Sequence, residues 1–136
     1  MKHFFSWNDF KSWVEEHYGE KLYAGVGISV RKNGNFFLRS VDNTYYYNDD
    51  LENPQHCFYT LYGKTGDQDI HEKRYNAPFL EKSKNIYLYR VKYITSTQKE
   101  YIWYGKYRLD GIIIEEQHPD EEGKMRTIFL VGLEKV

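Results

Sequence analysis

The sequence predicts a small α+β protein whose strands form a curled or closed antiparallel β-barrel, with an N-terminal helix and one short internal helix. Three observations predict it: apolar residues at helical spacing before residue 19, an Asn-Gly pair between two β-type runs, and long β-branched and aromatic stretches after residue 85. The 136 residues are expected to form one domain, with a docking helix in residues 1–20 and the barrel in residues 24–134.

The first expected element is a helix that begins after Ser6 and runs to about Tyr18. The Ser6 hydroxyl can cap backbone amides near Asp9, and the helix dipole favours the Asp9 carboxylate in this first turn. Apolar residues follow at spacings of three and four, namely Phe10, Trp13, Val14 and Tyr18. Gly19 is placed to end the helix. This pattern predicts a helix that docks on the barrel and carries no site.

A hairpin is expected next. Ala24–Arg31 and Asn35–Ser40 are β-type runs, and Lys32-Asn33-Gly34 separates them. Asn-Gly between two such runs is a strong signal for a tight turn. Three consecutive tyrosines follow at residues 45–47, and at least one of them must point away from the core if this segment is extended.

The middle of the chain predicts a short strand and a short helix. Phe58–Leu61 is the strand, and it leads into a loop with glycines at 63 and 66. In Arg74–Lys84, Pro78 suits the first turn of a helix, so Asn76 is expected to cap it.

The rest of the sequence reads as strands, because β-branched and aromatic residues dominate it. The expected strands are Ile86–Ile94, Tyr101–Leu109, Gly111–Glu116 and Thr127–Leu133. Trp103 is expected in the core, and Tyr104 on the floor of any pocket that the barrel forms.

Composition excludes some classes of protein. Cys57 is the only cysteine, so no internal disulfide and no cysteine-based zinc cluster can form, which indicates a reducing compartment. The N-terminus has no apolar run typical of a signal peptide, and no window resembles a membrane span. We therefore expect an intracellular protein, cytoplasmic or nuclear, with no membrane partner.

Charge is distributed unevenly along the chain. Residues 64–108 contain ten Lys and Arg against five Asp and Glu, so this part carries +5 and the remainder −6 of the total −1. Either a phosphate-binding surface or lysines that solvate strand edges would produce this pattern. Aromatic content is 18%, with fourteen tyrosines, which suits both stacking surfaces and the wet exterior of a barrel.

Eight short motifs follow one another in a characteristic order across roughly residues 25–134. They are Gly27-Ile28, Tyr47-Asn48-Asp49, Tyr59-Thr60, Gly66-Asp67-Gln68, Asn76-Ala77 through Leu80, Ile86-Tyr87-Leu88-Tyr89, Tyr104-Gly105-Lys106-Tyr107 and Phe129-Leu130-Val131. This order resembles the SRA (YDG) domains, which are similar to PUA-like barrels. It is most similar to the diverged SRA domains fused to HNH nucleases in McrA-type modification-dependent restriction enzymes.

The sequence departs from that family in three places. Leu61 stands where Gly usually follows Tyr-Thr, Pro78 interrupts the usual helix start, and Tyr104-Gly105 lacks the Asp of the better-known Tyr-Asp-Gly strand. The first two departures fall near the expected pocket, so the sequence leaves the identity of the base open.

The resemblance implies a non-catalytic module that flips a modified cytosine out of duplex DNA and into an aromatic pocket. By motif position, Tyr47 and Tyr59 would stack on the base, Asp49 would accept from the cytosine N4 amine, and Thr60 would meet the remaining edge. Asp67 and Gln68 would read or brace the base, or else close their own loop through bonds to the backbone. The candidates for phosphate contacts are Lys64, Lys73, Arg74, Lys82 and Lys84.

Each of these residues also has an ordinary structural role. Without the resemblance, Tyr47 would be an exposed turn tyrosine, Tyr59 a core residue, and Asp49 part of a solvated turn. The implied partner is double-stranded DNA with a modified base, and a separate nuclease or effector chain would act on it.

An enzyme is not expected, because His56, Asp67 and His71 are the only local cluster of histidine and acid, and they match no catalytic or metal signature. Neither a cofactor nor a metal is expected. Two other functions remain open: a PUA-like binder of RNA or modified nucleotides, and a protein-interaction domain that inhibits a host factor.

Overall fold

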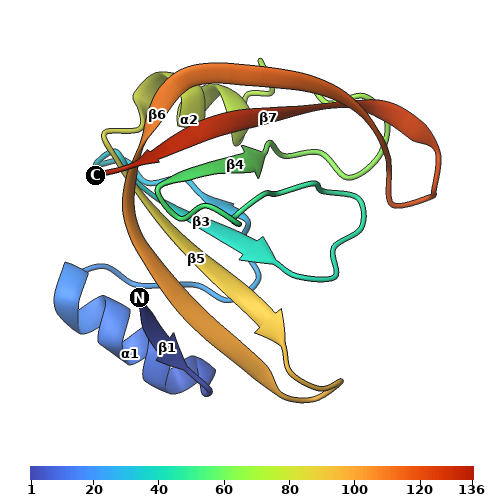
Figure 1. Cartoon of the computed structure of the whole chain (residues 1–136). Helices are drawn as coiled ribbons and strands as arrows, with labels where there is room; N and C mark the ends of the chain where they lie inside the picture. The colour runs from blue at the N-terminus through green and yellow to red at the C-terminus, as the bar shows by residue number, and fades with distance from the viewer.

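The computed structural model describes residues 1–136 and contains two helices and seven strands (Figure 1). In chain order these are β1 (Lys2–Phe4), α1 (Trp7–Tyr18), β2 (Ile28–Ser29), β3 (Asn35–Val41), β4 (His56–Thr60), α2 (Asn76–Lys82), β5 (Asn85–Tyr93), β6 (Lys99–Pro119) and β7 (Met125–Lys135). The α+β class predicted from the sequence is confirmed. No helix is long and apolar enough to cross a membrane.

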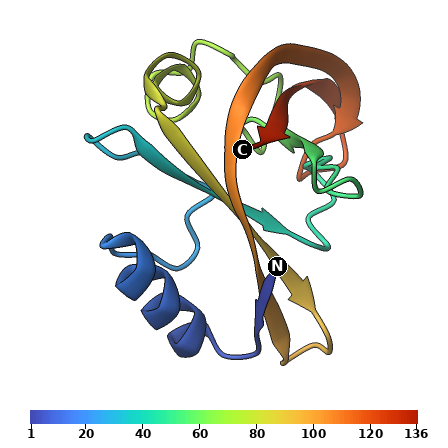
Figure 2. The same ribbon diagram turned by 60° about the vertical axis from the view of Figure 1, so that its left-hand side comes forward.

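All strands belong to one sheet in the order β2-β3-β5-β6-β7-β4, and β1 pairs with β6 outside this path. β6 is 21 residues long and pairs with β5 along its first part and with β7 along the rest. The pairing register shifts between Leu109 and Ile113, and Gly111 within this stretch has a φ of 86°, a conformation that favours glycine. The sheet therefore curls into a half-barrel, which Figure 2 shows most clearly where β6 arches over β7 and β4.

One strand pair is parallel, so the sheet is mixed and not purely antiparallel as the sequence predicted. β3 and β5 run side by side in register from Asn35↔Asn85 to Val41↔Val91. A parallel pair needs a long crossover, and the segment that contains β4 and α2 supplies it. The other pairs are antiparallel. The long crossover is what brings the middle of the chain to the concave side of the sheet.

Two hydrophobic cores lie on opposite faces of the sheet. Residues two apart on a strand share a face, so Ile86 and Leu88 of β5 enter a core of fifteen buried residues inside the curl, whereas Tyr89 and Val91 enter a core of seven on the other face. The second core is covered by α1 through Phe10 and Val14. Trp103 belongs to this core with 5% of its surface exposed, as the sequence predicted.

The N-terminal helix follows the sequence prediction closely. The Ser6 hydroxyl accepts a bond from the Asp9 amide at 3.3 Å, and Gly19 ends the helix with a φ of 69°. β1 was not predicted. It pairs Lys2 to Phe4 with Trp103 to Tyr101, and this long-range pairing leaves no local signal in a three-residue segment.

Two strand assignments differ from the sequence prediction. The hairpin is present, but its first strand is reduced to Ile28–Ser29. The two strands expected at Tyr101–Leu109 and Gly111–Glu116 are a single strand, because the irregularity near Gly111 bends β6 without ending it.

The capping residue predicted for α2 was also wrong. The Glu72 carboxylate, not Asn76, accepts from the amides of Tyr75 and Asn76, at 2.7 and 3.0 Å. The Asn76 side chain is fully buried and instead bonds the backbone of Tyr62 and Asp69. It therefore fixes the start of α2 against the loop that follows β4.

Candidate functional site

A cavity of about 360 Å³ opens on the concave side of the sheet. Its walls come from residues 25–28, the ends of β3 and β4, the loop of residues 44–49, the loop after β4, and Tyr75 beside α2. Of the residues singled out from the sequence, it brings together Tyr47, Asp49, Tyr59 and Lys64. Segments that are far apart in the chain thus converge on one site.

Tyr59 forms a fixed wall of the cavity. Only 4% of its surface is exposed, and its hydroxyl lies 2.9 Å from the Arg39 carbonyl oxygen and 3.2 Å from that of Gly27. Burial raises the pKa of the Tyr59 phenol well above its ordinary value, so the hydroxyl stays protonated and donates. The ring is thereby anchored at its tip.

Tyr47 forms a second aromatic wall. It is half-buried, and its hydroxyl accepts a long bond of 3.4 Å from the Gly63 amide. Burial raises the pKa of Tyr47 to about 12. Tyr46 contacts it edge-on, with ring centroids 4.9 Å apart, and lines the same cavity. The sequence motif did not single out Tyr46, although the run of three tyrosines was its signal.

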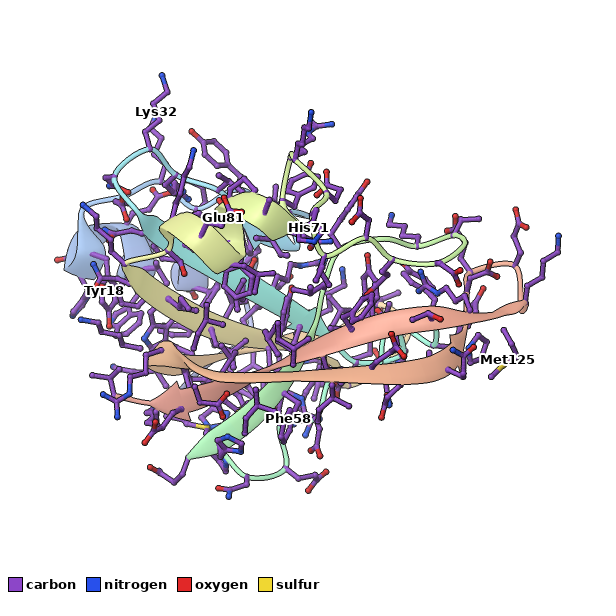
Figure 3. The ribbon with its side chains drawn as sticks, turned by 90° about the horizontal axis from the view of Figure 1, so that it is seen from above. Tyr18, Lys32, Phe58, His71, Glu81 and Met125 are labelled. Atoms are coloured by element: carbon purple, nitrogen blue, oxygen red, sulfur yellow. The ribbon has the colours of Figure 1, made fainter.

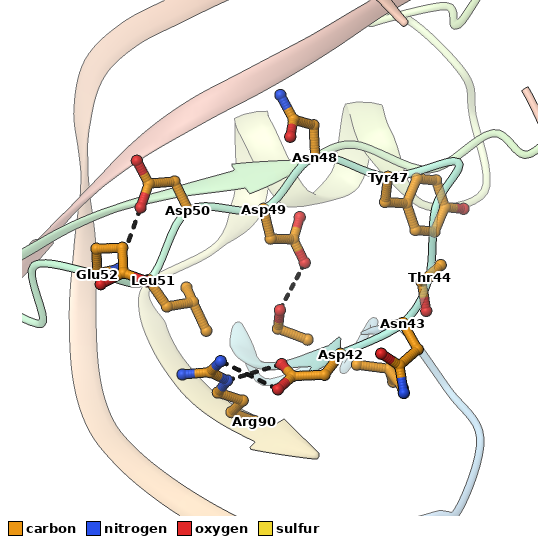
Figure 4. A pocket seen from close by; sticks show the side chains of 12 residues that line it. Asp42, Asn43, Thr44, Tyr47, Asn48, Asp49, Asp50, Leu51, Glu52 and Arg90 are labelled. Atoms are coloured by element: carbon orange, nitrogen blue, oxygen red, sulfur yellow. Dashed lines mark hydrogen bonds and ion pairs between the residues drawn. The ribbon is translucent and has the colours of Figure 1, made fainter. Parts of the chain in front are cut away.

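Asp49 carries the polar chemistry of the site. One carboxylate oxygen accepts from the Ser40 hydroxyl at 2.7 Å, and the other accepts from the Thr60 amide at 2.7 Å. In Figure 4 the Asp49 side chain extends from its loop, and a dashed line marks one of its hydrogen bonds. The pKa of Asp49 is raised above its ordinary value, and burial is the largest cause of this shift. The Thr60 side chain is a third partner of this carboxylate, and a carboxylate has about four acceptor positions, so acceptor capacity remains for a ligand.

Thr60 orients its neighbours. Its amide donates to Asp49, and its hydroxyl accepts from the Asn48 amide at 2.9 Å. Because 2% of the residue is exposed, both polar groups are committed within the protein. Thr60 thus holds Asp49 and its loop in position.

Asp67 and Gln68 close the glycine loop. The Asp67 carboxylate accepts from the Thr127 amide at 2.8 Å. The Gln68 side chain donates to the carbonyls of Leu61 and Gly63 and accepts from the Phe129 amide at 2.9 Å. Neither residue lines the cavity. Of the two roles considered for this pair, their contacts match loop closure.

Arg126 is a bracing residue that sequence reasoning missed. It is 2% exposed and donates to the carbonyls of Gly63, Gly66 and Tyr46. These bonds tie the tyrosine loop to the glycine loop through β7. No local pattern around Arg126 signals this role, because its partners are sixty or more residues away.

A second, smaller cavity of about 200 Å³ lies beside the first, and Figure 4 shows its lining. It shares Val41, Thr44, Tyr47 and Asp49 with the first cavity. Its far wall is the ion pair of Arg90 and Asp42, whose Arg Nε lies 2.8 Å from an Asp oxygen. Tyr104 is buried and accepts from Arg90 at 3.3 Å, so it lies under this wall and not at the cavity surface.

The candidate phosphate contacts occupy different places. Lys64 lines the first cavity, whereas Lys82 and Lys84 line a separate groove at the other end of α2. Lys73 and Arg74 are exposed, and the Arg74 guanidinium lies 5.1 Å from the ring centre of Tyr75. No group of three or more His, Cys, Asp or Glu is arranged to hold a metal ion.

No family model and no curated protein matches the chain. Solved structures do match. The MspJI restriction endonuclease in complex with a 27-mer oligonucleotide gives a TM-score of 0.65 at 16% identity, covering 86% of this chain and 34% of that chain. The sulfur binding domain and SRA domain of ScoMcrA, complexed with phosphorothioated DNA, give a TM-score of 0.62 at 18% identity, covering 99% of this chain and 39% of that chain.

The chain has an SRA-like fold. KRYPTONITE in complex with mCHG DNA and SAH adds a TM-score of 0.57 at 16% identity, covering 99% of this chain and 31% of that chain. The chain thus spans between 31% and 39% of the lengths of these three matched proteins. The SRA-like resemblance predicted from the ordered motifs is confirmed at the level of the fold.

Proposed function

We propose that this chain binds duplex DNA and holds a modified cytosine, flipped out of the helix, in the cavity lined by Tyr47, Asp49 and Tyr59. The observation that carries the proposal is the Asp49 carboxylate, which two protein donors hold in place in a cavity that also has two tyrosine walls. KRYPTONITE bound to mCHG DNA and ScoMcrA bound to phosphorothioated DNA share the fold, which supports DNA as the partner.

The energies involved are compatible with base flipping. Extruding a base from a duplex costs a few kcal/mol in lost stacking and pairing. Stacking on an aromatic side chain returns about 1–3 kcal/mol per base. A matched hydrogen bond between a carboxylate and the cytosine N4 amine contributes about 1–3 kcal/mol of discrimination. Two tyrosines and Asp49 together are of the right size to offset the cost.

The site is held in shape before a ligand arrives. Arg126 connects the loops of Tyr46 and Gly63, and Gln68 connects the glycine loop to β7. A pocket whose loops are already ordered spends less binding free energy on ordering them. This bracing supports a reader that recognises one ligand shape.

The chain would act as a binding module without catalysis of its own. In this proposal Lys64, Lys73 and Arg74 contact phosphates near the mouth of the cavity and position the duplex without reading its sequence. A separate nuclease or effector chain would then act on the DNA that this module marks.

The test is binding of the purified chain to matched duplexes that contain cytosine, 5-methylcytosine, 5-hydroxymethylcytosine or glucosylated 5-hydroxymethylcytosine at one position. Fluorescence anisotropy gives the Kd of each duplex and of the single-stranded forms. We expect one modified duplex to bind more tightly than the unmodified duplex. In Asp49→Asn the side chain presents a donor to the cytosine N4 amine in one orientation and a single acceptor in the other, so the affinity for the preferred duplex should fall by roughly 5- to 150-fold.

Asp50→Asn is the matched control, because the exposed side chain of this adjacent acid lines the smaller cavity and not the larger one proposed to hold the base. It should leave the affinity for the preferred duplex unchanged. If the protein without substitutions binds all duplexes equally, the proposed function is rejected. Tighter binding to single-stranded RNA or to free nucleotides would replace it with a PUA-like role.

A further inference from the structure

A second surface feature is a basic groove of about 610 Å³ between the β2–β3 turn and the C-terminal half of α2. Arg31, Lys32, Lys82 and Lys84 line it, and Glu81 is the only acidic residue in its lining. In the view from above in Figure 3, Lys32 projects from the turn beside α2, which carries Glu81. The groove is distinct from both cavities of the candidate site, with which it shares no residue.

The charges in this groove are unpaired. None of its four cations takes part in any of the six ion pairs of the structure. The Arg31 guanidinium is held by neutral partners: it donates to the Ser29 hydroxyl at 3.2 Å and lies 4.8 Å from the ring centre of Phe37. A concave surface with uncompensated positive charge attracts anions.

The groove has a fixed floor. The Gly34 carbonyl accepts from the amides of Lys84 and Asn85, at 2.8 and 3.1 Å, so the turn is bonded to the start of β5. Gly34 has a φ of 84°, and a Cβ at this position would lie 2.9 Å from the Lys84 Cγ. The aliphatic stem of Lys84 therefore lies directly on Gly34.

The groove continues the walls of the larger cavity. Residues 25–28 and Tyr75 line the cavity, and the same two segments continue into the groove as residues 30–34 and 78–84. Helix α2 (Asn76–Lys82) begins next to Tyr75 at the cavity, ends at Lys82 in the groove and has seven residues. At 1.5 Å per residue it spans about 10 Å. That length corresponds to about three base-pair steps of 3.4 Å.

We propose that this groove holds the phosphodiester backbone of the DNA on one side of the flipped nucleotide, about three nucleotides away from it. The inference rests on the proposed function, because the distance is counted from a base in the cavity. It adds Arg31 and Lys32 to the DNA-contacting surface and assigns Lys82 and Lys84 to a site separate from the cavity mouth.

The first test is the salt dependence of binding. Each phosphate contact contributes about −0.9 to the slope of log K against log salt for duplex DNA. In the triple variant Lys32→Ala, Lys82→Ala, Lys84→Ala, we expect the slope to become shallower by about 2–3, with the preference for the modified base unchanged. The control is Lys92→Ala, Lys99→Ala, Lys106→Ala, which removes three lysines of β5 and β6 that line neither site.

The second test places the contact along the DNA. Uncharged methylphosphonates, introduced one at a time around the modified base, should weaken binding at about three nucleotides on one side of it. The same substitution should have a smaller effect on the triple variant, which keeps only Arg31 of the four cations in the groove.

The outcomes separate the two proposals. A triple variant with an unchanged salt slope overturns the groove even if the modified base is preferred. A shallower slope without any base preference retains the groove as a phosphate site and rejects the base pocket. Absence of salt-dependent binding by the protein without substitutions overturns both proposals. Equal effects of the triple variant and its control overturn the groove alone.

Discussion

Two regions of this molecule are rich in aromatic side chains, and they use them in opposite ways. Beneath α1, rings pack on rings: Phe10 lies 5.1 Å from Tyr89 and 5.5 Å from Tyr101, measured between centroids. At the cavity, Tyr59 forms no ring pair, and its hydroxyl is bonded to backbone carbonyls instead. The ring of Tyr59 is thus held by its tip, whereas the rings beneath α1 are held by one another.

The largest expected effect breaks the packed region. Phe10 is fully buried against several rings, so Phe10→Ala should lower the free energy of unfolding by about 3–5 kcal/mol. Urea unfolding followed by tryptophan fluorescence measures it. The preference of the folded fraction for modified DNA should stay the same. A loss below about 1 kcal/mol would show that this region does not behave as a close-packed core.

The second largest effect is expected from a substitution in the wall of the larger cavity. Tyr47→Ala removes one stacking wall, so the Kd for the preferred modified duplex should rise by roughly 5- to 150-fold. Stability should change less than in Phe10→Ala, because Tyr47 is only half-buried. Tyr93→Ala, at an exposed tyrosine outside the cavity, is the control for anisotropy. Equal losses in both variants would mean that the effect is not stacking in the cavity.

The third prediction concerns pH. Burial raises the pKa of Asp49, so ionisation of this group opposes folding, and its cost grows as pH rises from the ordinary value of 3.8 through the raised pKa. Binding has the opposite dependence, because an ionised carboxylate accepts a hydrogen bond from the N4 amine more strongly than the neutral acid does. Kd for the modified duplex should therefore rise as pH falls through the raised pKa. The Asp49→Asn variant should lack this dependence, and an identical pH profile for both proteins would contradict the assignment.

The smallest effect sharpens the comparison. Tyr59→Phe keeps the ring and removes the hydroxyl that reaches the Arg39 and Gly27 carbonyls. Stability should fall by about 1 kcal/mol, the net value of such a hydrogen bond. The ring that would stack on the base is retained, so affinity for the modified duplex should change by less than about threefold. A threefold change in Kd corresponds to about 0.7 kcal/mol of binding free energy. A large loss of affinity with intact stability would show that the hydroxyl, and not the ring, contacts the base.

Local physics made much of the fold predictable. The Ser6 cap and Gly19 end of α1, the Asn33-Gly34 turn and the strand content all depend on residues close in sequence. For the site, the ordered motifs predicted Tyr47, Asp49 and Tyr59 as pocket residues, and these three residues line one cavity. What these three share is a position next to a strand end or turn that the motifs identify.

The remainder depends on contacts between distant residues. The parallel pairing of β3 with β5, the addition of β1 to β6 and the bracing by Arg126 all join segments that no local pattern links. The misplaced cap of α2 has a related cause. Asn76 is a good capping residue in isolation, but its amide is used to hold Tyr62 and Asp69, and Glu72 takes over the cap.

The dependence of the cavity on β7 has a consequence for how the protein forms. β4 pairs with β7 from His56↔Glu134 to Thr60↔Leu130, and Arg126 holds the tyrosine and glycine loops together. β4 and the loops of the cavity therefore cannot form these contacts until β7, about seventy residues later in the chain, has been synthesised. Contacts of such sequence separation are slow to form. Ligand-binding competence should accordingly be among the last properties that the folding chain gains.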